Sequence, residues 1–173
     1  METTKNDLPP DIKKFFYNLS DYLDTKLLYY GSVQRSDYVP GKSDIDVDIF
    51  TDNSDSLKSK LQHFLHLKKN NFKKVMYVID DNTIYGHKVK YENTEKKIKA
   101  EFSIYSEEDK AIIIKQHQKK IVLPIYISVI LYILKTFYYR IPILPKSFYV
   151  SSKNWILDTI DNPNNKFIVL EDQ

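Results

Sequence analysis

The segment Asp44–Phe50 alternates strictly between acidic and apolar residues, and it constrains the fold more than any other stretch of the chain. Side chains on a β-strand point alternately to the two faces of the sheet. A strand here therefore has one acidic face and one apolar face, and only the apolar face suits a hydrophobic core. The acidic set is Asp44, Asp46 and Asp48, and the apolar set is Ile45, Val47 and Ile49.

Hydrophobic spacing predicts the remaining elements, with a three- to four-residue period for helices and a two-residue period for strands. Most strands precede most helices, which indicates an α+β fold: a mixed β-sheet with flanking helices, followed by a C-terminal helical segment. The helix at 123–139 is expected to be the most buried. Expected helices cover 11–26, 55–67, 107–119, 123–139 and 151–160, and expected strands cover 27–30, 44–50, 72–80, 88–92 and 97–105.

Composition excludes several classes of protein. The 173 residues include no cysteine, so disulfides, thiolate zinc sites and thiol catalysis are ruled out. The apolar run at 121–134 is shorter than the roughly 20 residues of a membrane span, so we expect no membrane partner and a cytoplasmic location. The richness in Lys, Asn, Ile and Tyr is typical of an AT-rich genome; a viral source would place the protein in the host cytoplasm.

Paired carboxylates on one strand face indicate a metal site. Residues two apart on a strand have Cα atoms roughly 7 Å apart, and carboxylates that close repel each other unless a cation lies between them. Mg²⁺ prefers carboxylate and phosphate oxygens, and a pair of such ions promotes in-line phosphoryl displacement. The lysine and serine before Asp44 favour the pair Asp44 and Asp46, while Asp46 with Asp48 remains an alternative.

A Gly-Ser turn precedes this strand and suits a phosphate ligand. Gly31 follows a short apolar run, and glycine lets a backbone approach a phosphate without a clash from a β-carbon. Ser32 adds a hydroxyl donor. The turn and the carboxylate pair therefore supply complementary halves of a site for a nucleotide and its metal.

These residues resemble the signature of the DNA polymerase β-like nucleotidyltransferases, a superfamily that includes poly(A) polymerases, terminal nucleotidyltransferases and oligoadenylate synthetases. The signature is the Gly31-Ser32 turn, a gap of about a dozen residues, and Ser43-Asp44-Ile45-Asp46. The resemblance implies a palm-like nucleotidyltransferase domain at 1–106 and a helical segment at 107–173 that lines the nucleotide cleft. It also implies that Gly31 and Ser32 hold the triphosphate, and that Asp44 and Asp46 bind two Mg²⁺ or Mn²⁺ ions.

The family also has a third carboxylate on a later strand, usually Asp, which acts as a metal ligand and base. Glu101 matches that place, and Glu92 is the alternative on the neighbouring strand. Ser43 belongs to the motif, and Lys135 and Lys153 are candidates for the triphosphate, because a polyanion needs compensating cations. His117 stands alone in the sequence and is assigned no role.

The resemblance implies transfer of a nucleoside monophosphate from a nucleoside triphosphate to an acceptor hydroxyl, with release of pyrophosphate. We expect untemplated transfer, with a nucleic-acid 3′ end as the favoured acceptor. One alternative is a non-catalytic family member that binds nucleotide or a partner, which the Glu at position 101 favours. The other is a nucleic-acid-binding module that uses the lysine-rich hairpin at 87–99.

Overall fold

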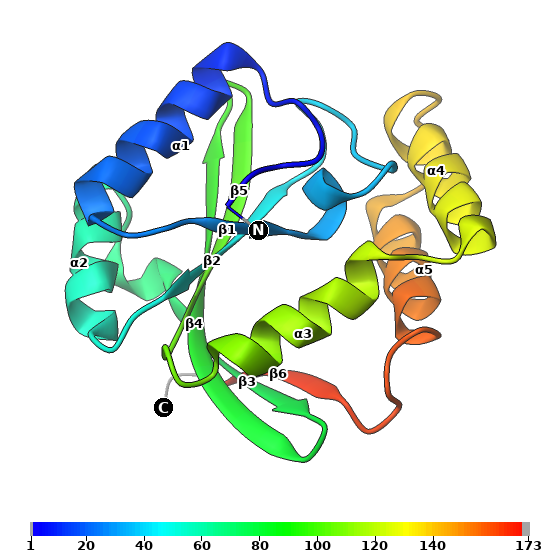
Figure 1. The fold of residues 1–173 in the computed structure, drawn as a ribbon. Coiled ribbons are helices and arrows are strands. Elements are labelled where there is room, and N and C mark those ends of the chain that lie inside the picture. The colour runs from blue at the N-terminus through cyan, green and yellow to red at the C-terminus, as the bar shows by residue number, and fades with distance from the viewer. Residues whose placement is uncertain (1, 171–173) are drawn as a thin grey trace.

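A six-stranded sheet in the order β1-β2-β5-β4-β3-β6 organises the computed structural model, which describes residues 2–170 (Figure 1). Strand β2 runs parallel to β5, and every other neighbouring pair is antiparallel. The sheet is therefore mixed, as the sequence predicts. The strands are β1 (Leu28–Tyr30), β2 (Ile45–Phe50), β3 (Lys73–Ile79), β4 (Asn82–Asn93), β5 (Ile98–Tyr105) and β6 (Lys166–Leu170). The helices are α1 (Pro10–Leu23), α2 (Ser54–Leu65), α3 (Lys110–Ile121), α4 (Ile125–Tyr139) and α5 (Lys146–Asp158), with 3₁₀ turns η1 (Gly31–Gln34) and η2 (Lys69–Asn71).

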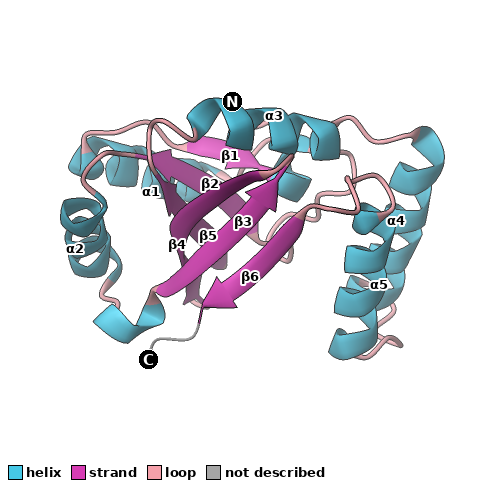
Figure 2. Ribbon diagram, turned by 90° about the horizontal axis from the view of Figure 1, so that it is seen from below, coloured by secondary structure: helices cyan, strands magenta, loops and turns pink. Residues whose placement is uncertain are grey.

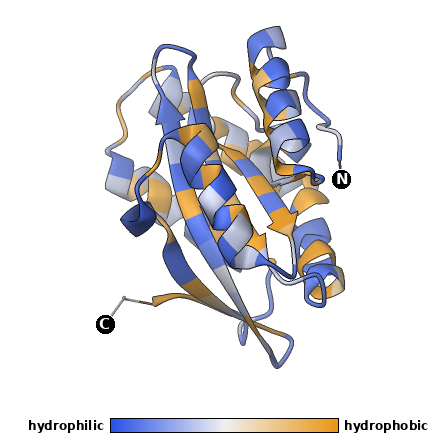
Figure 3. Cartoon of the chain, turned by 90° about the vertical axis from the view of Figure 1, so that its left-hand side faces the viewer, coloured by the Kyte–Doolittle hydropathy of each residue, from blue (hydrophilic) through white to orange (hydrophobic). Residues whose placement is uncertain are grey.

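The apolar face of β2 lies in the main hydrophobic core, beneath α1 and α2. Ile45, Val47 and Ile49 are each at most 1% exposed. They pack with Phe102 of β5 and with Phe16 of α1, among other apolar side chains. Figure 3 shows the alternating hydrophilic and hydrophobic bands along the strands that this arrangement requires. The two-residue period therefore places the acidic residues of β2 on the opposite face.

That opposite face is covered by α3 at one end. Ile113 of α3 packs onto Phe50 and Tyr105, which follow the acidic positions on their strands. Figure 2 shows α3 crossing above the strands while α4 and α5 stand together at the side of the sheet, away from α1 and α2. The polar centre of this face thus lies between α3 and the α4–α5 pair.

The expectation that 123–139 forms the most buried helix is wrong. In α4 only Ile127, Leu131 and Lys135 are buried. The helix packs on α5 through a small cluster that includes Ile156, and its outer side is exposed, with Ile125 at 84%. A helix with one main packing partner buries only one stripe, whatever its composition. No single described helix has the length and hydropathy of a membrane span; α3 and α4 reach them only as a pair bent by 80°.

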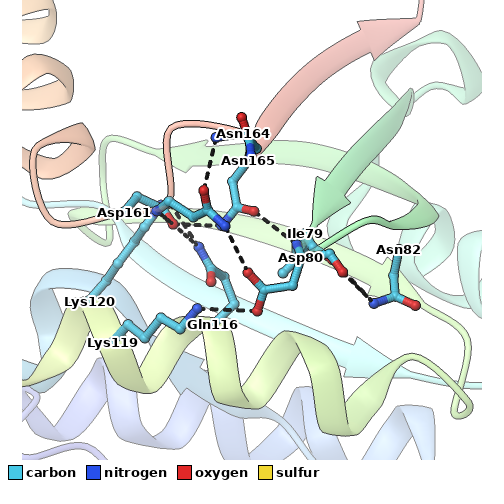
Figure 4. Close-up of polar contacts among 10 residues, drawn as sticks. Ile79, Asp80, Asn82, Gln116, Lys119, Lys120, Asp161, Asn164 and Asn165 are labelled. Atoms are coloured by element: carbon cyan, nitrogen blue, oxygen red, sulfur yellow. Dashed lines mark hydrogen bonds and ion pairs between the residues drawn. The ribbon is translucent and has the colours of Figure 1, made fainter.

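The end of the chain differs from expectation, because α5 begins earlier than predicted and β6 was not predicted. Strand β6 pairs with β3 and extends the sheet, although 107–173 was expected to be helical. Its five residues are too few to show a clear period. Figure 4 shows the contacts that bring it there: Asp161 accepts hydrogen bonds from Gln116 of α3, and Asn165 accepts one from the backbone of Asp80.

Candidate active site

The Gly31 turn lies directly against the carboxylate of Asp46. Strand β1 pairs with β2 so that Tyr30 is opposite Asp46, and η1 begins at the next residue. Gly31 has a φ of +66°, and a β-carbon built on it would stand 2.0 Å from Asp46 Oδ2. Only glycine permits both the left-handed backbone and this close approach. The two halves of the sequence motif are therefore in contact.

Asp46 is a half-buried carboxylate with other charged side chains around it. The parallel pairing of β2 with β5 places it opposite Glu101. Burial raises the pKa of the Asp46 carboxyl to about 6, and the charges of Glu101 and Asp44 act in the same direction. Lys153 of α5 and Lys88 of β4 oppose this effect only in part. A carboxylate with these surroundings favours a nearby cation or a proton.

Asp44 precedes β2 and is exposed, unlike Asp46. Two tyrosines from the helical segment lie near it: its charge contributes to the raised pKa values of Tyr139 and Tyr149, in which burial is the larger cause. Tyr149 stacks on Tyr138 with ring centroids 4.1 Å apart. The ends of α4 and α5 thus border the exposed side of the carboxylate pair.

Glu101 is bound by lysines. Its Oε1 atom is 2.5 Å from Lys88 Nζ, and its Oε2 atom is 3.4 Å from Lys90 Nζ. Burial, the largest single cause, would raise the pKa of Glu101, but the charges and hydrogen bonds of Lys88 and Lys90 together outweigh it, and the pKa lies below its ordinary value. The alternative carboxylate, Glu92, lies opposite Lys99 and is bound to it at 2.9 Å. Of the two, Glu101 is therefore the one that faces Asp46.

Asp48 is buried under α3, and the residue that meets it was given no role from the sequence. His117 Nε2 lies 2.6 Å from Asp48 Oδ2, and the His117 ring stacks on Tyr30 with centroids 4.0 Å apart. Burial raises the pKa of Asp48, although His117 partly opposes this. His117 shares a helix face with Ile113, four residues earlier, which is the one sequence signal that it points toward the sheet.

Ser43 and Lys135 belong to one buried network behind the motif. Lys135 Nζ donates to Ser43 Oγ at 3.3 Å and to the backbone oxygen of Asp37 at 2.8 Å. Asp37 also binds Arg35 at 2.8 Å, and both partners are less than 10% exposed. Lys135 therefore ties α4 to the loop that carries Ser43, whereas Lys153 is only half-buried and its charge reaches Asp46.

The three carboxylates that the resemblance implies as metal ligands are not arranged as one ligand set in the described residues. Asp44 and Asp46 lie two residues apart, and burial disfavours the charged form of Asp46, a cost that a bound cation would offset. Glu101 already has a lysine on each oxygen. Within residues 2–170, no group of three or more His, Asp or Glu side chains is arranged to hold a metal ion.

Comparison with known proteins agrees with the fold and the motif. The model of the nucleotidyltransferase domain family matches residues 11–144, which include the Gly31 turn, all three carboxylates and α3. The α+β fold and the site thus define a nucleotidyltransferase of the polymerase β-like superfamily, and the chain belongs to the nucleotidyltransferase domain family. A search of curated proteins gives no match to the chain.

Proposed function

We propose that this protein transfers a nucleoside monophosphate from a nucleoside triphosphate to an acceptor hydroxyl and releases pyrophosphate. The contact between Gly31 and Asp46 is the observation that carries the proposal. It places a turn suited to phosphate beside a carboxylate whose surroundings favour a cation. A nucleic-acid-binding module that uses the lysine-rich hairpin would not need this pairing of a left-handed glycine with a half-buried aspartate.

Each residue of the site has a part in the proposed reaction. Asp44 and Asp46 would hold Mg²⁺ or Mn²⁺, which neutralises phosphate charge when bound. The Gly31-Ser32 turn and Ser43 would bind the triphosphate, with Lys153 as the nearby half-buried cation. Lys135 would act on the triphosphate indirectly, because its hydrogen bond to Ser43 would position the Ser43 hydroxyl. Glu101 would accept the proton of the attacking hydroxyl once one of its two lysine contacts is released.

The acceptor is proposed to be a nucleic-acid 3′ end, extended without a template. The hairpin at 87–99 gives less support to a nucleic-acid-binding module. Lys88 and Lys99, two of its basic residues, are engaged by Glu101 and Glu92.

The test is a screen of the four labelled nucleoside triphosphates against RNA, DNA and protein acceptors, with Mg²⁺ and with Mn²⁺. We expect metal-dependent pyrophosphate release that is lost in the double variant Asp44→Asn/Asp46→Asn. Asp52→Asn, an exposed aspartate just beyond β2, is the matched control and should retain activity. Nucleotide binding without transfer would favour the non-catalytic alternative, and equal activity in the double variant would overturn the proposal.

A further inference from the structure

Lys88 is a half-buried cation on the carboxylate face, and the proposed reaction leaves it unused. Its side chain is 17% exposed, and its ammonium group lies 2.5 Å from Glu101 Oε1. It also lies over the ring of Phe167 in β6, 5.1 Å from the centroid. Tyr77 of β3 interacts with it as well. Strands β3, β4, β5 and β6 therefore all contribute to the position of this one amine.

The position of Lys88 decides what Glu101 can bind. A carboxylate ligates a metal ion through an oxygen lone pair, and the same lone pairs accept the hydrogen bonds of an ammonium group. Lys88 and Lys90 each contact one oxygen of Glu101, so a metal ion at either oxygen would have to compete with an ammonium group. The Lys88 charge also reaches Asp46, which lies opposite Glu101. A second divalent ion placed between Asp46 and Glu101 would meet this ammonium charge.

We propose that Lys88 replaces a second metal ion, so that without nucleotide the chain binds one divalent ion, at Asp44 and Asp46, and Glu101 is not a ligand. This inference deepens the proposed function and rests on it for the identity of the ion site. Lys88 then acts as a positioning residue, which neutralises Glu101 and holds it beside Asp46. The exposed Lys90 adds a weaker contact to the other oxygen.

The experiment is a titration of the full chain with Mn²⁺ alone, followed by electron paramagnetic resonance and calorimetry to obtain the number of sites. We expect one site in the wild type, none in Asp44→Asn/Asp46→Asn, and one in Glu101→Gln. Lys88→Met should bind a second ion, and that ion should be lost again in Lys88→Met/Glu101→Gln. Lys90→Met is the matched control, because Lys90 is 81% exposed, and should keep one site.

Several results would overturn the inference. They are two sites or none in the wild type, loss of the single site in Glu101→Gln, or one site in a folded Lys88→Met. Circular dichroism verifies folding, and if Lys88→Met does not fold, the comparison of the wild type with Glu101→Gln decides. Different results would refute the inference and the proposed function. Two ions on the nucleotide-free wild type, in a protein that carries out transfer, refute the inference alone, whereas one ion on the nucleotide-free wild type with no transfer refutes the function alone.

Discussion

The carboxylate of Asp46 fills the space that a side chain on Gly31 would need, because a β-carbon there would stand 2.0 Å from Asp46 Oδ2. The conflict involves more than two atoms, since the carbon of the same carboxylate would be 2.9 Å away. Residue 31 therefore determines both the shape of the turn and the position of the carboxylate. This relationship leads to the first prediction.

Gly31→Ala should lower the free energy of unfolding by about 2–4 kcal/mol, because it combines left-handed strain with overpacking. Gly41→Ala is the matched control. Gly41 also has a positive φ, of +71°, but no atom lies within 4 Å of the place that a β-carbon would occupy, so only about 1–2 kcal/mol of strain is expected. Urea denaturation measures both variants. Equal losses would show that the contact with Asp46 has no energetic effect.

Asp46→Asn should stabilise the metal-free protein at neutral pH. The pKa of Asp46 is raised to about 6 from an ordinary value of 3.8, so its ionised form opposes folding above pH 6. That cost disappears as the pH falls from 6 to 4. We expect the variant to gain roughly 1–2 kcal/mol at pH 7.5 and little at pH 4.

Chemical denaturation in the presence of a chelator at several pH values measures this gain. Asp44→Asn, at the exposed carboxylate, is the control and should change the free energy of unfolding by less than about 0.5 kcal/mol. A metal-free Asp46→Asn protein that is less stable than the wild type at pH 7.5 would contradict the expectation. It would mean that the neighbouring lysines compensate the charge fully.

His117→Ala should destabilise the fold by about 2–4 kcal/mol, because it leaves the carboxylate of Asp48 buried without its hydrogen-bond partner. It also removes the stack on Tyr30. Thermal unfolding measures the loss. His63→Ala is the control, since His63 is exposed and contacts the hydroxyl of Tyr22, and it should cost less than about 1 kcal/mol.

The double variant Asp48→Asn/His117→Ala separates charge from packing. Removal of both partners should recover part of the loss, because no buried charge is then left unpaired. If the double variant is as unstable as His117→Ala plus Asp48→Asn added together, the two residues are not coupled. The hydrogen bond between Asp48 and His117 would then contribute nothing beyond the packing of the ring.

Asp161 should make the attachment of the C-terminal segment sensitive to acid. Burial alone would raise its pKa, but hydrogen bonds from Lys120 and Gln116 outweigh burial and lower the pKa to about 2 (Figure 4). A depressed pKa means that the stabilisation is complete above pH 4 and is lost as the pH falls toward 2. Asp161→Asn should therefore cost about 2 kcal/mol at pH 6 and progressively less below pH 4.

Denaturation curves between pH 6 and pH 3 measure this dependence. Asp158→Asn, an exposed position in α5, is the control and should show the wild-type dependence on pH. Hydrogen exchange at the amides of β6 provides a local readout, because β6 follows the Asp161 contacts directly. Unchanged exchange in Asp161→Asn would show that pairing with β3 holds the strand by itself.

Local patterns in the sequence were sufficient for much of the fold and for the core of the motif. The two-residue alternation in 44–50 predicted which face of β2 is buried. The apolar residues on either side of Asn93-Thr94-Glu95 predicted the β4–β5 hairpin. Both inferences succeed because they depend on the direction of side chains along a single strand, which the backbone geometry dictates.

Contacts between distant segments were decided only by the tertiary structure. Lys88 looked like part of a basic surface, yet strand pairing places its amine on Glu101. His117 looked isolated until α3 crossed the sheet above Asp48. The exposed side of α4 also depends on long-range packing. The composition of a helix indicates which side chains can be buried, but it does not indicate how many other elements pack against the helix. The sequence by itself thus determined the family motif and its faces, while long-range packing decided which charges neutralise one another.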